Sequence, residues 1–169
     1  DARGLPYTGS GAAASSLAMD KVATKRVLAA AGIPTAAYEL LPPGAAVTSL
    51  PLPVVVKPPC DGSSVGVGLV RRSGEWKAAL EEARRVDPQG RALVETYIPG
   101  REWTVGILLD EALPVVEIRA PGGWYGFDAK YTAGRTQYVF PDGPDDRALA
   151  DRCRRLALES FRAAGCRGM

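Results

Sequence analysis

Histidine is absent from the 169 residues, and this absence excludes several kinds of catalytic site within the chain. Without an imidazole, neither a Ser-His-Asp triad nor a Cys-His pair can form here, and a histidine-based metal site is excluded as well. Any chemistry in this chain must therefore use lysines, carboxylates, hydroxyl groups, backbone amides or groups from another segment.

Cysteine is scarce, and long apolar runs are missing. The three cysteines, Cys60, Cys153 and Cys166, are odd in number and lack paired spacing, which predicts free thiols rather than a disulfide framework or a zinc site. No run approaches the roughly eighteen apolar residues that span a bilayer, and no signal or transit peptide pattern is visible at the start. Together these absences predict a cytoplasmic chain with no membrane partner.

Excess charge of one sign is also lacking. The net charge of +2 is too close to zero to favour nucleic acid or an anionic membrane as a partner. The composition, 46% hydrophobic and 24% charged, is that of an ordinary globular protein. The length suits one medium domain or two small lobes with a real core.

Hydrophobic periodicity and turn residues predict a mixed chain. Asp20 and Asp145 are expected to cap helices, and Ala23, Val27, Ala30 and Ala31 would share one face of the first of these. Helices are predicted at 10–17, 20–31, 73–85 and 145–164, strands at 36–41, 54–57, 65–71, 92–98, 102–109, 113–119 and 136–140, and a long loop at 121–134.

The first candidate site is a lysine followed by a glycine-rich loop. Lys57 ends a predicted buried strand, and 61–68 reads Asp-Gly-Ser-Ser-Val-Gly-Val-Gly. Glycines let backbone amides approach phosphate oxygens, hydroxyl groups add donors, and an ammonium neutralises charge. The loop is neither a Walker A loop nor a dinucleotide fingerprint. From the residues alone, a flexible turn between two strands remains an equal alternative.

Two further stretches suit a nucleotide enzyme. The strand edge at 93–98 could offer backbone groups to adenine, and Glu102 could accept ribose hydroxyl groups. The loop 124–131 combines aromatic, basic and flexible residues, which is typical of a lid that closes on substrate. The alternatives are a core strand and an exposed loop whose aromatic residues pack against its base.

In this order and spacing, seven segments resemble the D-alanine–D-alanine ligases over nearly the whole chain. The Gly-Ser-Ser-Val-Gly loop with a downstream Ala-Lys-Tyr is the most specific part of the match. The segments are Leu5-Pro6-Tyr7-Thr8-Gly9-Ser10-Gly11, Met19-Asp20-Lys21, Val56-Lys57-Pro58, Gly62-Ser63-Ser64-Val65-Gly66, Val94-Glu95, Glu102-Trp103-Thr104-Val105 and Asp128-Ala129-Lys130-Tyr131.

The resemblance implies roles for the residues of the phosphate side. Lys21 and Lys57 would hold the ATP phosphates, and Ser63 and Ser64 would lie in the small loop that covers them. Ser63 would also begin a hydrogen-bond network on the substrate side. The candidate catalytic residues are Ser63, Lys130 and Tyr131, with Lys130 on the γ-phosphate and Tyr131 bonding towards Ser63.

The resemblance also implies how the nucleoside would be held. Glu95, Tyr97 and Ile98 would form the adenine-contacting segment, the last two through their backbone, and Glu102 would be the ribose carboxylate.

The fold that the resemblance implies is α+β ATP-grasp, in which two α/β lobes clamp ATP between their sheets. Residues 1–9 would end the connection from a missing N-terminal domain. Residues 10–95 would form the central lobe, and 96–169 a C-terminal lobe without its last strands.

The implied activity is ATP-dependent joining of two D-alanines through an acylphosphate, for peptidoglycan precursor synthesis. The substrates would be D-alanine and ATP, and the intact enzyme could be a homodimer. The carboxylates and amide that hold Mg²⁺ would follow Met169, so this chain would supply no metal ligand and would be inactive alone.

Two alternatives stay open. One is a related ligase that takes D-lactate or D-serine as its second substrate, although Lys130 and Tyr131 together favour dipeptide formation. The other is a nucleotide-binding module without catalysis.

Overall fold

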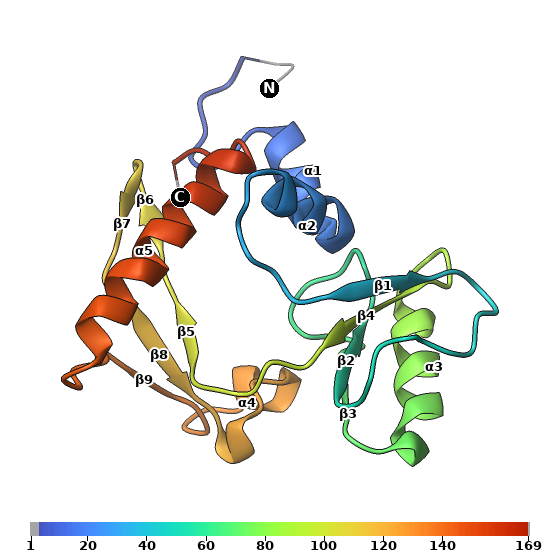
Figure 1. The fold of residues 1–169 in the computed structure, drawn as a ribbon. Helices are drawn as coiled ribbons and strands as arrows, with labels where there is room; N and C mark the ends of the chain where they lie inside the picture. The colour runs from blue at the N-terminus through green and yellow to red at the C-terminus, as the bar shows by residue number, and fades with distance from the viewer. Residues whose placement is uncertain (1–3, 169) are drawn as a thin grey trace. The chain divides into compact units, whose positions relative to one another are not determined.

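The computed structural model describes residues 4–168, which group into two compact units (Figure 1). Unit 2 comprises residues 19–22 and 35–100, and unit 1 comprises the residues up to 18, 23–34 and those from 101 onward. The domain boundaries expected from the sequence, after 9 and after 95, stay a prediction. Residues 1–3 and 169, at the outer ends of those expected domains, lie outside the described residues.

Unit 2 is built on a four-stranded antiparallel sheet. Alternation of side chains along each strand sends one set of residues to each face of the sheet. Val55 lies opposite Glu95, and Lys57 lies opposite Leu93, in the register of the two central strands. The strand order is β1-β4-β2-β3, with β1 Tyr38–Leu41, β2 Val54–Lys57, β3 Gly68–Val70 and β4 Ala92–Thr96.

One helix, α3 (Trp76–Val86), covers one face of this sheet and encloses the core of unit 2 (Figure 1). This is the helix predicted at 73–85, where Trp76, Ala79, Leu80 and Ala83 recur at the spacing of one helix face. Leu80 and Ala83 are buried in the core, and the other two pack against it. Burying one Val or Leu side chain contributes about 1.5–3 kcal/mol. The buried members are Leu41, Val54, Val56, Val70, Leu80, Ala83, Ala92 and Val94.

Unit 1 contains two small antiparallel sheets and most of the helical residues. The sheet of three strands has the order β5-β8-β9, and α5 contacts both strands of the other sheet. The strands are β5 Glu102–Thr104, β6 Ile107–Leu108, β7 Glu111–Ala112, β8 Val116–Arg119 and β9 Gln137–Val139. The helices are α1 Ala12–Met19, α2 Lys21–Ala30 (whose first two residues group with unit 2), α4 Phe127–Tyr131 and α5 Asp146–Ala163.

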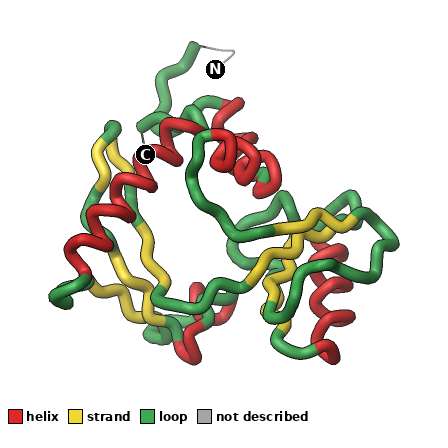
Figure 2. Tube along the Cα trace, in the orientation of Figure 1, coloured by secondary structure: helices red, strands yellow, loops and turns green. Residues whose placement is uncertain are grey.

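The structure corrects the expected loop at 121–134. This segment holds a 3₁₀ turn, η2 (Pro121–Gly123), and the helix α4, which Figure 2 marks between loop segments. The amide of Lys130 donates to the Gly126 carbonyl at 3.1 Å, and Thr132 closes the same turn. Residues 127–133 contain neither glycine nor proline, so a single helical turn can form there.

The expected strand 102–109 is also corrected, because it splits into β5 and β6 at Gly106. Leu113 donates its amide to the Gly106 carbonyl at 2.8 Å, and a Cβ on Gly106 would lie 3.2 Å from Leu113 Cδ1. This close approach of a neighbouring segment requires a residue without a side chain.

The two expected helix caps behave differently. The Asp20 carboxylate accepts the amide of Val22 at 2.9 Å, which confirms the first cap. Asp145 occupies the cap position of α5 but makes no cap bond, and instead Asp146 accepts the amide of Gly143 at 3.0 Å. On the expected apolar face of α2, Ala23 and Val27 are half-buried and residues 30 and 31 are exposed, while Val22 and Lys25 are the buried residues of this helix.

Candidate nucleotide-binding site

Lys57 ends β2 on the sheet face opposite α3. Val54 and Val56 of the same strand are fully buried in the core, so alternation sends Lys57 to the other face. In the register of β2 and β4, Lys57 and Glu95 are diagonal neighbours on that face, and they form an ion pair. The sheet therefore presents an ammonium group next to a buried carboxylate.

Lys21 places a second ammonium group in the same unit. Its amide donates to the Pro59 carbonyl at 3.0 Å, and its Nζ donates to the Asp61 carbonyl. Burial lowers the pKa of Lys21, and the charge of Lys57 lowers it further. Two cations close enough to repel one another gain when an anion binds between them. This arrangement suits a polyphosphate.

The glycine-rich loop beside these lysines has an unusual backbone. Ser63 and Ser64 adopt φ values of 55° and 59°, in the left-handed region that ordinary residues avoid. Gly66 also has positive φ, and a Cβ there would lie 2.8 Å from Val86 Cγ2. Such strain is concentrated at ligand-binding segments, where it orients backbone groups. The alternative of an unconstrained turn is therefore disfavoured.

Tyr97 and Ile98 follow directly after β4. The amide of Tyr97 donates to the Pro53 carbonyl at 3.1 Å, so an adenine contact at this residue would have to use its carbonyl oxygen. Ile98 is 68% exposed, which leaves its side chain available for apolar contact.

Glu102 and Lys130 interact within unit 1. Glu102 begins β5 at an exposed position, yet the protein atoms around its carboxyl group remove enough water to raise its pKa, an effect that Lys130 opposes. Lys130 Nζ lies 5.1 Å from the ring centroid of Tyr125, whose hydroxyl group pairs with that of Tyr138 at 2.7 Å. Sequence reasoning placed Tyr125 in the lid segment but missed Tyr138 and the pairing, which joins β9 to this segment only in three dimensions.

Tyr131 lies on α4 with its ring 4.9 Å from that of Phe127, and it is 60% exposed. The structure thus brings Lys21, Lys57, Glu95 and the serine loop together in unit 2, and Glu102 and Lys130 together in unit 1. The bond expected between Tyr131 and Ser63 joins residues of different units and stays a prediction.

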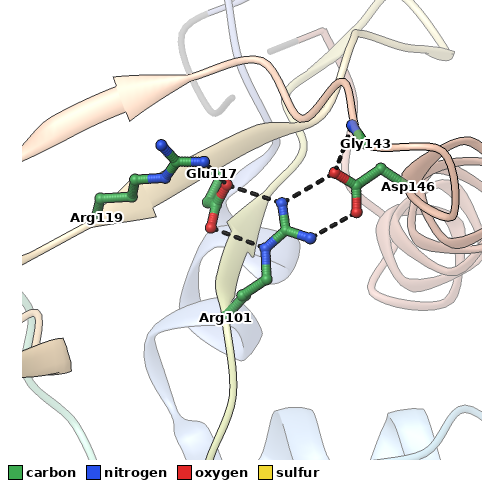
Figure 3. A network of polar contacts seen from close by, with 5 residues as sticks. All are labelled: Arg101, Glu117, Arg119, Gly143 and Asp146. Atoms are coloured by element: carbon green, nitrogen blue, oxygen red, sulfur yellow. Dashed lines mark hydrogen bonds and ion pairs between the residues drawn. The ribbon is translucent and has the colours of Figure 1, made fainter.

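A polar network around Arg101 is a second feature that sequence reasoning missed. Its guanidinium group lies between the carboxylates of Glu117 and Asp146, and Arg119 also donates to Glu117 (Figure 3). No local pattern could have found it, because its members are up to 45 residues apart.

Residues 4–168 contain no group of three His, Cys, Asp or Glu side chains placed to hold a metal ion. The expectation of free thiols is confirmed for Cys60, Cys153 and Cys166. Within the same described residues, no helix is both long and apolar enough to cross a membrane.

The fold is that of solved D-alanine–D-alanine ligases, and this likeness confirms the expected α+β ATP-grasp class. A family model described as the D-ala D-ala ligase C-terminus matches residues 27–169, so the chain belongs to the D-alanine–D-alanine ligase family.

Individual relatives agree with this assignment. The chain is 44% identical over 164 residues to a D-alanine–D-alanine ligase of Alcanivorax borkumensis, covering 97% of the chain and 52% of the relative. The corresponding protein of Citrifermentans bemidjiense is 45% identical, with 96% and 53% covered. The chain therefore spans about half the length of the curated relatives it matches.

Solved structures give the same result. The D-alanine–D-alanine ligase of Bacillus anthracis matches with a TM-score of 0.82 and 31% identity, over 99% of this chain and 55% of that one. The structure of the same organism's ligase complexed with ATP matches with a TM-score of 0.78 and 30% identity, over 99% and 54%.

Proposed function

We propose that this chain is the nucleotide-binding part of an enzyme that joins two D-alanines at the expense of ATP, for peptidoglycan precursor synthesis. The carboxylate of the first D-alanine attacks the γ-phosphate of ATP, which forms an acylphosphate and releases ADP. The amine of the second D-alanine then attacks the acyl carbon and displaces phosphate. The support is membership of the family together with the names of the relatives.

The observation that carries the proposal is the pair of cations at Lys21 and Lys57. Burial lowers the pKa of Lys21 and the charge of Lys57 lowers it further, and the strained Ser63–Ser64 segment lies in the loop that follows Lys57. Phosphoryl transfer is catalysed mainly by positioning and charge neutralisation, which lysines and backbone amides can provide without histidine.

We assign the remaining contacts on the same basis. Ser63 and Ser64 cover the phosphates, and Glu95, Tyr97 and Ile98 line the adenine. Glu102 accepts the ribose hydroxyl groups. Lys130 neutralises the γ-phosphate, and Tyr131 closes the lid towards Ser63, where exclusion of water protects the acylphosphate.

Magnesium is not supported by the described residues. They contain no carboxylate cluster that fits Mg²⁺, which prefers several oxygen ligands in octahedral geometry. We therefore propose that residues outside this chain supply its ligands. An active cytoplasmic homodimer is part of the same proposal, and sedimentation of the full-length protein would test its oligomeric state.

We infer the dipeptide as product, rather than a product with D-lactate or D-serine, and the support is the presence of Lys130 and Tyr131 together on α4. A nucleotide-binding module without catalysis would bind ATP and yet release no phosphate when D-alanine is added.

The experiment is a comparison of phosphate release from ATP with and without D-alanine in the full-length protein that contains these residues. D-alanine should stimulate release, and D-lactate should not replace it as second substrate. Lys57→Ala should abolish most of the activity, while Lys77→Ala, which removes an 87% exposed ammonium from α3, should retain it. ATP binding without D-alanine-dependent release would refute the ligase.

A further inference from the structure

Arg101 lies directly before β5 and is bound by two carboxylates at once (Figure 3). Its Nε and Nη2 donate to Glu117 at 2.8 and 2.9 Å, and its Nη1 and Nη2 donate to Asp146 at 2.5 and 3.0 Å. Four charge-assisted bonds from one planar group fix both its position and its orientation. The start of β5 is thus tied to β8 and to the first turn of α5.

Both carboxylates are themselves held in place. Glu117 is 5% exposed and accepts a further bond from Arg119 at 2.9 Å. Asp146 is 8% exposed and accepts the amide of Gly143 at 3.0 Å. Because Glu117 and Asp146 are each held by a further hydrogen bond, they fix the position of the Arg101 guanidinium, and this set of bonds is called the anchor.

The anchor lies on one face of β5, and Glu102 lies on the other. Trp103 is opposite Glu117 in the strand register, and the Arg101 guanidinium lies 4.8 Å from the Trp103 ring centroid, so these three side chains share a face. Glu102 is opposite Ile118, and side chains alternate along a strand, so its carboxylate points to the opposite face.

The backbone before the anchor provides little restraint of its own. Gly100 adopts φ of 147°, a region open to glycine alone, and β5 is only three residues long. Glu102 is the first of those three residues, where a short strand frays most easily. A fixed side chain at the preceding position would prevent this.

We propose that Arg101 is the positioning residue for Glu102, holding the first residue of β5 so that the Glu102 carboxylate meets the nucleotide ribose. This inference rests on the proposed function, in which Glu102 accepts the ribose hydroxyl groups. Lysine cannot replace Arg101, because a point charge lacks the fork that engages two carboxylates together.

The test uses the full-length protein and two nucleotides, ATP and 2′,3′-dideoxy-ATP, which lacks both ribose hydroxyl groups. The ratio of their kcat/KM values measures the ribose contact and should be on the order of 100 for the unaltered protein, because hydrogen bonds to a charged group are strong. Arg101→Lys should lower this ratio roughly tenfold while the KM for D-alanine stays within about twofold.

Two variants complete the design. Glu117→Gln keeps the side-chain shape but weakens the anchor, so it should also lower the ratio of the two kcat/KM values. This variant tests the positioning role even if Arg101→Lys fails to fold. Arg119→Ala removes a 54% exposed guanidinium from the same carboxylate but leaves all four Arg101 bonds in place, so it should lower the ratio much less than Arg101→Lys does.

The outcomes distinguish the positioning role of Arg101 from the ribose contact of Glu102. If Glu102→Ala abolishes the preference for ATP but Arg101→Lys and Glu117→Gln both retain it, the positioning role is overturned and the proposed function stands. If Glu102→Ala itself leaves the ratio unchanged, the ribose contact is wrong, and the role of Arg101 falls with it.

Discussion

Lys57 and Glu95 form an ion pair across β2 and β4, on the sheet face that α3 leaves uncovered. Lys57 retains 21% of its side-chain surface and Glu95 retains 11%, so both are largely buried and Lys57 is the more accessible partner. An ammonium group has three donors, and it can therefore keep its carboxylate while it also binds phosphate.

Lys57→Ala should lower kcat/KM for ATP by about 100-fold in the full-length protein, because a fixed charge in a closed phosphate site stabilises the transferring group strongly. Steady-state kinetics with saturating D-alanine would measure this loss. Lys77→Ala is the matched control on exposed surface. Equal ATP kinetics in the Lys57 variant and the control would remove Lys57 from the site.

Tyr131→Phe should act on the amino-acid substrates rather than on ATP. The exposed hydroxyl group is expected to bond across the closed lid, so its loss should raise the KM for D-alanine about tenfold and relax the choice of second substrate. Calorimetric titration should give an ATP Kd within about twofold of the unaltered value. A selective loss of ATP affinity would contradict the assignment.

The lid segment 122–135 should gain protection from hydrogen exchange when ATP and a phosphinate inhibitor bind the full-length protein. Glycines at 122, 123, 126 and 134 interrupt this segment, and its regular structure consists of two short turns, the end of η2 and α4. Amides of α3, packed on the core of unit 2, serve as the internal control and should not change. Equal protection with and without ligands would exclude lid closure.

Acid should destabilise unit 1 through Glu117. Hydrogen bonds from Arg101 and Arg119 lower the pKa of Glu117 from 4.5 to about 2. Because the folded state holds the lower pKa, its stabilisation is complete above about pH 4.5 and is lost as the pH falls towards 2. Thermal unfolding between pH 7 and pH 2.5 should show a smaller fall in Tm for Glu117→Gln than for the unaltered chain. Parallel curves for the two would refute this linkage.

Residues 1–169 alone should show no D-alanine-dependent phosphate release, since the chain spans about half of its relatives and its described residues offer no magnesium cluster. Weak ATP binding with little dependence on Mg²⁺ is expected instead. A coupled phosphate assay with the purified chain would measure this. Turnover at the rate of a complete ligase would contradict the placement of the metal ligands elsewhere.

The sequence by itself determined the features that depend on local pattern. The spacing in α3, the strand β2 and the cap at Asp20 all follow from the period of apolar residues and from backbone chemistry within a few positions. The seven segments, in their order and spacing, were sufficient to indicate the family by resemblance.

Only the tertiary structure decided which distant groups meet. The Lys57–Glu95 pair depends on a strand register, and the anchoring of Arg101 by Glu117 and Asp146 depends on the packing of β5, β8 and α5. The split of 102–109 at Gly106 and the helix inside the lid likewise depend on contacts that propensity cannot specify. Which distant residues pair depends on burial, charge and chain geometry over the whole unit. A short stretch of sequence does not specify these factors.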